Sequence, residues 1–219
     1  MPSLASKANS SSGNFSLRYD GDADTLDGAV ILRPDSIHVF GTGATGNITR
    51  TGAITFDNIQ SIRVNNVYNS NYHTYIIYLK STLLFQSGFS SLLYYWNTLN
   101  ETESTTGYRT QSVNYVLDQS PTLIRSASSE TIAAIAGNAG ADQNFSIDYS
   151  MSNITIYRPS LVSPTVLRNI SATYGYKYGL YDLSVYHSES ISYNSFGLYI
   201  GSGGSDRITG TMIVYGYGG

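Results

Sequence analysis

Gly41, Gly43 and Gly46 form a G-x-G-x-x-G pattern, the spacing with which dinucleotide-binding folds hold a pyrophosphate. That pattern works only where the third glycine opens a helix whose N-terminus faces the phosphates. The residues that follow here, 47–56 (NITRTGAITF), have the composition of a β-strand and include a further glycine. We therefore interpret the pattern as a loop, and we expect no cofactor.

The stretch DGDADTLDG, residues 20–28, spaces its aspartates as the first ligands of a calcium-binding loop are spaced. An EF-hand needs glycine at its sixth position and glutamate at its twelfth, and these positions are Thr25 and Ile31 here. The EF-hand interpretation therefore fails. An acidic turn is the better interpretation and a calcium site of another kind is the alternative; we predict no metal site.

The residue types that carry catalysis are scattered. His38, His73 and His187 have no ligand partner two or four residues away, which favours surface or interface positions over a metal site. The chain has no cysteine and no G-x-S-x-G nucleophile elbow. We predict that the protein is not an enzyme. The alternative, an enzyme acting on cell-wall or capsule sugars, would need two carboxylates paired in a groove.

Composition favours a β-rich protein with an adaptable polar surface. Of 219 residues only 12% are charged, against about 25% in an average protein. The chain has 20 tyrosines and 21 glycines, which suit pleated sheets and tight turns. The net charge of −3 without a basic cluster argues against a nucleic-acid partner. No apolar run approaches the roughly 18 residues of a membrane span, and residues 1–13 lack the apolar core of a secretory signal.

Short alternating segments separated by turn residues dominate the chain, as is typical of β-sandwiches. We predict strands over residues 26–33, 36–40, 53–56, 61–67, 74–80, 91–96, 108–118, 144–149, 153–157, 166–173, 179–187, 196–200 and 207–215. Residues 126–141, rich in Ser and Ala, either form a long loop or hold a short helix at 129–136. The predicted fold is all-β, a jelly-roll-like antiparallel β-sandwich over residues 51–219. Residues 1–50 would form an N-terminal arm or a small β attachment region, with a soft boundary near residues 46–52.

The C-terminal segment, residues 196–217, holds two apolar strands around a Gly/Ser turn and ends in ITGTMIVYGY. It resembles the closing hairpin of a β-sandwich domain common in tail-fibre and other virion proteins of environmental tailed phages. Residues 56–59 (FDNI), 71–79 (NYHTYIIYL) and 91–96 (SLLYYW) resemble the opening of the same domain. The matching C-terminal residues are Thr209, Gly210, Thr211, Val214, Tyr215, Gly216 and Tyr217. The resemblance covers about residues 56–217 and implies a virion location and a sandwich that is displayed as an oligomer.

The terminal strand also allows a physical interpretation. Gly210 lies between β-forming residues, which indicates a bulge or a close backbone approach. Tyr215 and Tyr217 share one face of the strand with Ile213. An exposed aromatic edge would invite aggregation, so we favour packing between subunits over closure of the sandwich alone.

Two functional hypotheses follow. The first is a tail-fibre or receptor-binding protein that binds a host-surface glycan, because tyrosine offers a flat apolar face with a hydroxyl. The second is a capsid decoration or head-fibre protein with a purely structural role. Both hypotheses place the chain in the virion, where other virion proteins are its partners. Both also predict a homo-oligomer, and the family resemblance implies a trimer. The predicted ligand patch is Tyr174, Tyr176, Tyr178 and Tyr181, with Trp96 as a second position; core or subunit packing is the alternative for each.

Overall fold

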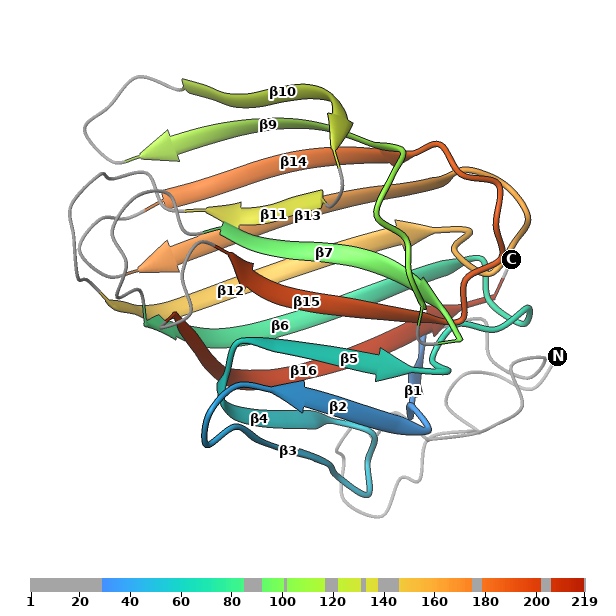
Figure 1. Cartoon of the computed structure of the whole chain (residues 1–219), viewed down its shortest axis with the longest axis horizontal. Helices are drawn as coiled ribbons and strands as arrows, with labels where there is room; N and C mark the ends of the chain where they lie inside the picture. Colours follow the sequence, from blue (N-terminus) through green and yellow to red (C-terminus); the bar gives the residue numbers. More distant parts are fainter. Residues whose placement is uncertain are drawn as a thin grey trace, which may run out of the picture.

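Two antiparallel β-sheets pack face to face in the computed structural model and enclose the hydrophobic core between them (Figure 1). The structure describes residues 29–84, 92–100, 102–116, 122–130, 133–137, 146–174, 179–201 and 206–218. Within these ranges no helix has the length and apolar character to cross a membrane. The predicted all-β sandwich is confirmed.

The larger sheet has ten strands, and one of its faces is turned away from the smaller sheet. Its strands in spatial order are β10 (Thr122–Glu130), β9 (Tyr108–Val116), β14 (Gly179–His187), β13 (Thr165–Tyr174), β12 (Ser146–Tyr157), β6 (Thr74–Leu84), β16 (Arg207–Tyr217), β4 (Ile54–Ile59) and β3 (Thr45–Ile48). The tenth, β1 (Ala29–Leu32), pairs with the last residues of β16. Every pairing is antiparallel, and away from the register shifts in β4, β10, β12 and β16 successive side chains point to opposite faces of the sheet.

The smaller sheet has six strands and covers one face of the larger sheet (Figure 1). In spatial order they are β11 (Ala133–Gly137), β7 (Leu92–Leu99), β15 (Ser195–Gly201), β5 (Ser61–Asn65) and β2 (Ser36–Phe40). The short β8 (Thr102–Glu103) pairs with the end of β7. The chain passes repeatedly from one sheet to the other, as from β14 to β15 and back to β16. Such connections are typical of jelly-roll sandwiches.

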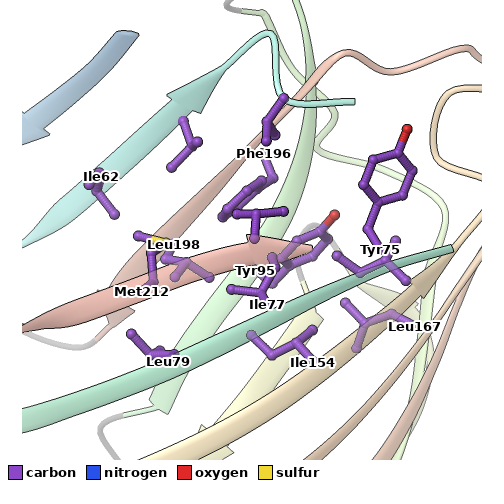
Figure 2. Close-up of a cluster of buried hydrophobic side chains, with 14 of the residues drawn as sticks. Ile62, Tyr75, Ile77, Leu79, Tyr95, Ile154, Leu167, Phe196, Leu198 and Met212 are labelled. Carbon is purple, nitrogen blue, oxygen red and sulfur yellow. The ribbon is translucent and has the colours of Figure 1, made fainter. Parts of the chain in front are cut away.

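The core consists of the inward-facing side chains of the two sheets (Figure 2). Ile77, Ile154 and Met212 of the larger sheet are fully buried beneath the smaller one. Phe196 of the smaller sheet stacks on Tyr68 and Tyr95, with ring centroids 5.8 and 5.9 Å away. Aromatic rings packed in this way bury large areas and gain further from their mutual orientation.

Several sequence predictions are met in detail and others are corrected. The segments at 36–40 and 179–187 are strands with those bounds, whereas the described residues 146–149 of one predicted segment and the whole of 153–157 belong to one long strand, β12. The suggested helix at 129–136 is wrong, because residues 129–130 end β10 and residues 133–136 lie in β11, and these strands pair with β9 and β7. Such pairing overrides the weak local preference of a Ser/Ala-rich segment.

The N-terminal region supplies strands to both sheets in the part of the chain that the structure describes. β1 pairs with β16, β2 with β5 and β3 with β4. The predicted boundary at residues 46–52 falls in the β3–β4 hairpin. Residues 1–28, which include the aspartates at 20–27, lie outside the described residues.

The glycine pattern forms a turn and a strand. Gly41 and Gly43 have φ values of 135° and 72° in the connection from β2 to β3, a conformation that glycine adopts without strain. Gly46 lies in β3, where a β-carbon would come within 2.7 Å of Cγ1 of Val39. No helix follows it, so the pattern does not build a pyrophosphate site. Among the described residues no three His, Asp or Glu side chains gather as a metal site would require.

Candidate functional site

The outer face of the ten-stranded sheet carries an unusual number of large side chains in solvent. They alternate along each strand with the buried core residues, so they point away from the smaller sheet. Large apolar side chains gathered on one exposed face are typical of a binding or contact site. Seven of these side chains are 41% to 50% exposed: Tyr78, Met151, Tyr157, Val166, Ile170, Leu180 and Tyr186.

Three tyrosines on this face lie in one row across the strands. Tyr186 of β14 is paired with Val166 of β13, which is paired with Tyr157 of β12. Tyr157 is in turn opposite Thr74 of β6, and Thr74 is opposite Tyr217 of β16. We call Tyr186, Tyr157 and Tyr217 the tyrosine row. These tyrosines lie on β14, β12 and β16, so one intervening strand separates each from the next.

Polar groups form the neighbouring row, two residues further along each strand. Its members are Gln111, Ser184, Arg168 and Thr155. Arg168 makes an ion pair with Asp182 at 3.2 Å from Nη2 to Oδ2, and both side chains are largely exposed. A pair of this kind contributes little to stability, because water screens it on both sides. It does place donors and acceptors beside the aromatic rings, a combination that suits binding surfaces.

A second cluster of aromatic rings adjoins the row at β16. Tyr78 and Tyr215 pack edge to face, with ring centroids 5.5 Å apart. Burial raises the pKa of Tyr217, and the nearby Tyr78 and Tyr215 raise it further. The hydroxyl of Tyr217 therefore stays protonated at neutral pH and can donate a hydrogen bond to a ligand. The prediction that Tyr215 and Tyr217 share one face is confirmed by their alternation with buried Val214 and Gly216.

The residues that the sequence singled out as a ligand patch lie elsewhere. Tyr181 is 4% exposed and faces the interior from β14, and Trp96 is 6% exposed. The Trp96 indole lies against Gly197, where a β-carbon would come within 2.2 Å of its ring, and it packs edge to face on Tyr199. Neither ring is part of an exposed patch, so packing, the alternative, is what the structure shows for both.

The other three members of that patch remain untested as ligand residues. Tyr174 is the last residue of β13 and pairs with Tyr149. Tyr176 and Tyr178 lie outside the described residues. The alternation of residues 179–187 predicts from sequence that Tyr186 and Tyr181 lie on opposite faces of the strand. This pattern could have identified Tyr186 as a member of the tyrosine row. Nothing in the sequence aligned Tyr186 with Tyr157 and Tyr217, because that alignment depends on pairings between distant segments.

A buried polar cluster surrounds His187, which is 1% exposed and thus not at the surface as its sequence context predicted. Its Nε2 lies 3.0 Å from the carbonyl oxygen of Thr106 and 3.1 Å from Oγ of Ser104. Its Nδ1 lies 3.1 Å from Nδ2 of Asn97. The imidazole also stacks on the ring of Tyr108, with centroids 4.0 Å apart.

The cluster superficially resembles a serine–histidine–asparagine hydrolase site, but its hydrogen bonds are arranged differently. A carbonyl oxygen only accepts, so Nε2 of His187 carries a proton and donates it to Thr106. Nε2 thus has no lone pair with which to take a proton from Ser104 Oγ. Nδ1 accepts from the Asn97 amide, whose Oδ1 accepts from the Tyr95 hydroxyl at 2.6 Å. The arrangement is a structural network and not a catalytic base.

The buried imidazole predicts that stability falls in mild acid. Burial lowers the pKa of His187 below its usual value of 6.5, although the bond to Thr106 and the nearby Glu189 oppose the change. Below pH 6.5 the His187 side chain is therefore protonated in the unfolded chain but still neutral in the folded chain. The stability that is present above pH 6.5 is lost progressively as the pH falls towards the lowered pKa. Urea unfolding at about pH 7.5 and about pH 5.5 measures this loss.

Two variants assign the effect to this residue. His187→Gln should lower stability at both pH values and reduce the difference between them. His73→Gln, at an exposed position, is the control and should leave the stability unchanged. An unaltered pH dependence in His187→Gln would mean that another group is responsible.

Comparisons with known proteins assign the chain to no family. No protein-family model matches the chain, and no curated protein matches it. Among solved structures the chain is similar to the CBM2 module of the evolved Dit protein of Lactobacillus casei BL23 phage J-1, with 7% identity, 89% of this chain and 92% of that chain covered, and a TM-score of 0.28. It is also similar to CBM35 from Paenibacillus barcinonensis, with 13% identity, coverage of 77% and 99%, and a TM-score of 0.15. Values this low identify neither a family nor a ligand. The class that the fold defines is a two-sheet antiparallel β-sandwich.

Proposed function

We propose that this chain is a bacteriophage virion protein of the tail-fibre or receptor-binding type, that it performs no catalysis, and that it binds host-surface glycans through the outer face of the ten-stranded sheet. The observation that carries the binding role is the set of half-exposed tyrosines on that face with polar side chains between them. Tyrosine rings pack on the apolar faces of sugars, and the neighbouring polar groups bond to sugar hydroxyls. The virion location rests on the resemblance of the C-terminal hairpin to phage proteins.

Binding to polysaccharide extracted from the host surface tests the role directly. A double variant, Tyr157→Ala with Tyr186→Ala, removes two rings that are 44% and 41% exposed. We expect binding to weaken by about tenfold or more, since each lost ring contact is worth roughly 1 kcal/mol. Phe40→Ala is the matched control, because Phe40 is 45% exposed on the outer face of the smaller sheet. Equal binding by the double variant and the wild type would exclude this face as the site.

The second candidate is a capsid decoration or head-fibre protein in which the same face packs against other virion subunits. The exposed Met151, Ile170 and Leu180 favour it, because aliphatic side chains of this size suit protein contacts. Immunogold labelling of purified particles separates the two. Label at the tail tip supports receptor binding, label over the head supports decoration, and unlabelled particles would remove the virion proposal.

The same contacts bear on the oligomeric state, for which we propose a homo-oligomer, with a trimer favoured by resemblance. Sedimentation at micromolar concentration measures it. A stable monomer would count against both the fibre role and the decoration role.

A further inference from the structure

The tyrosine row has a regular spacing that restricts the shape of a ligand. Neighbouring strands lie about 4.8 Å apart, so residues mounted two strands apart in one row lie about 9.6 Å apart. Tyr186, Tyr157 and Tyr217 occupy β14, β12 and β16 in this way, with Val166 and Thr74 between them. A ligand that contacts all three rings must therefore be long, and it must present an equivalent face at each of these intervals.

An extended β-1,4-linked polysaccharide has this repeat. Successive sugars in such a chain are turned over relative to one another, so every second sugar presents the same face. Two sugar residues of the extended chain span close to the length that separates members of the row, about 9.6 Å. An α-1,4-linked chain curves instead and does not keep its sugars in line. The spacing thus distinguishes between linkage types before any particular sugar is considered.

The charges around the row indicate an anionic chain. Arg109 continues the row beyond Tyr186, and Arg168 lies in the adjacent row between Tyr157 and Tyr186. Arg158 directly follows Tyr157 and is exposed. Within the described residues Arg109 and Arg158 form no ion pair, and Asp182 is the acid that faces Arg168. In a chain with a net charge of −3 this local concentration of arginine complements carboxylates, which guanidinium groups bind in two-pronged fashion.

We propose that the tyrosine row binds an extended β-1,4-linked polysaccharide that carries carboxylates, laid across the strands with every second sugar on Tyr186, Tyr157 and Tyr217. The inference rests on the proposed glycan-binding function and specifies its ligand. Arg168 contacts carboxylates from the side of the chain, and Arg109 contacts them in line with the row, beyond Tyr186. Binding requires at least five consecutive sugars, because the first and third rings are four sugars apart.

Calorimetry of the full chain with three hexasaccharides tests the proposal. The probes are a β-1,4-mannuronate with one carboxylate per sugar, cellohexaose with the same linkage and no charge, and maltohexaose with the α linkage. We expect the mannuronate to bind at least tenfold more tightly than maltohexaose, and cellohexaose to bind between them. Raising the salt concentration to about 1 M should weaken the mannuronate binding and leave cellohexaose unchanged. Mannuronate disaccharide should bind at least tenfold more weakly than the hexasaccharide.

Single variants test the row itself. Tyr157→Ala should weaken mannuronate and cellohexaose binding by about tenfold, whereas Tyr78→Ala, equally exposed on the same face but outside the row, should change binding less than twofold. Arg109→Ala should weaken mannuronate binding only. Both tyrosine side chains are half in solvent, so unchanged thermal unfolding is expected and confirms that the variants fold.

The outcomes separate this inference from the proposed function. Maltohexaose binding as tightly as the mannuronate, or equal losses in Tyr78→Ala and Tyr157→Ala, would overturn the row as the determinant while leaving glycan binding intact. Absence of binding to these probes and to the extracted host polysaccharide would overturn both. Conversion of an oligomer to a monomer by Tyr157→Ala, with no glycan bound, would show that a second copy of the chain covers this face and would also overturn both.

Discussion

Replacing Gly210 by alanine is expected to lower the free energy of unfolding by about 3 kcal/mol. Gly210 lies in the middle of β16, between β6 and β4. A β-carbon at this position would lie 2.3 Å from the carbonyl oxygen of Lys80 and 3.0 Å from Cα of Ser81. Both atoms belong to the backbone of a central strand, so no flexible side chain can move aside to relieve the clash. The two sheet pairings of β16 must shift instead.

The local pairing explains why glycine is required here. The register between β16 and β4 shifts between Ile208 and Gly210, which is the signature of a bulge. The prediction from sequence of a bulge or a close approach at Gly210 is therefore confirmed on both counts. Urea denaturation measures the effect, and Gly218→Ala is the control because nothing lies within 4 Å of its β-carbon position. A loss below about 1 kcal/mol would mean that β16 can separate from β6 without disturbing the core.

The strands were predictable from sequence because alternation is a local property. In the segment 179–187, buried and exposed positions alternate without exception beyond Gly179, and the pattern gives both the strand and its two faces. The Ser/Ala-rich segments β10 and β11 lack such alternation, and their conformation is decided by the neighbours with which they pair. Small polar residues also enter the interior: Ser152 and Ser171 are buried, although composition alone places serine at the surface.

The candidate binding surface could not be predicted in the same way. Tyr157, Tyr186 and Tyr217 are far apart in sequence. They fall in one row only because the sheet places β14, β13, β12, β6 and β16 side by side in this order. The sequence interpretation favoured tyrosines that are close together in the chain, in residues 174–181. Proximity in sequence is a poor guide in a sheet, because adjacent residues of a strand point to opposite faces. Tyr181 illustrates the point, since it is buried while its neighbour Leu180 is exposed.

Replacing Asn97 by leucine is expected to cost about 3 kcal/mol, because this buried side chain joins the polar networks of the two sheets. Asn97 is 1% exposed on β7 of the smaller sheet, and its amide donates to His187 on β14 of the larger sheet. Its Oδ1 accepts from the Tyr95 hydroxyl, which lies 2.9 Å from the hydroxyl of Tyr68. Burial raises the pKa values of both tyrosines well above 10, so both hydroxyls stay protonated and need hydrogen-bond partners.

Leucine has a similar volume but no polar atom, so Nδ1 of His187 loses its donor in a site closed to water. An unsatisfied buried acceptor costs about 1 to 3 kcal/mol, and the Tyr95 hydroxyl loses its acceptor as well. The matched control is Thr98→Val at the next residue, where a fully buried hydroxyl has no hydrogen-bond partner. Removing that hydroxyl should leave stability unchanged or raise it slightly, because no bond is broken and one desolvated group disappears.

Urea unfolding of the two variants at about pH 7.5 separates a specific network from general crowding of β7. Equal losses in Asn97→Leu and Thr98→Val would mean that the strand tolerates no change of shape and that the hydrogen bonds contribute little. A large loss in Asn97→Leu alone identifies the bridge from Tyr68 to His187 as the link between the sheets. Such a link lies behind one end of the tyrosine row, since His187 directly follows Tyr186 in β14 and points to the opposite face. The hydrogen bond that joins β7 to β14 therefore lies directly behind a ring of the proposed binding surface.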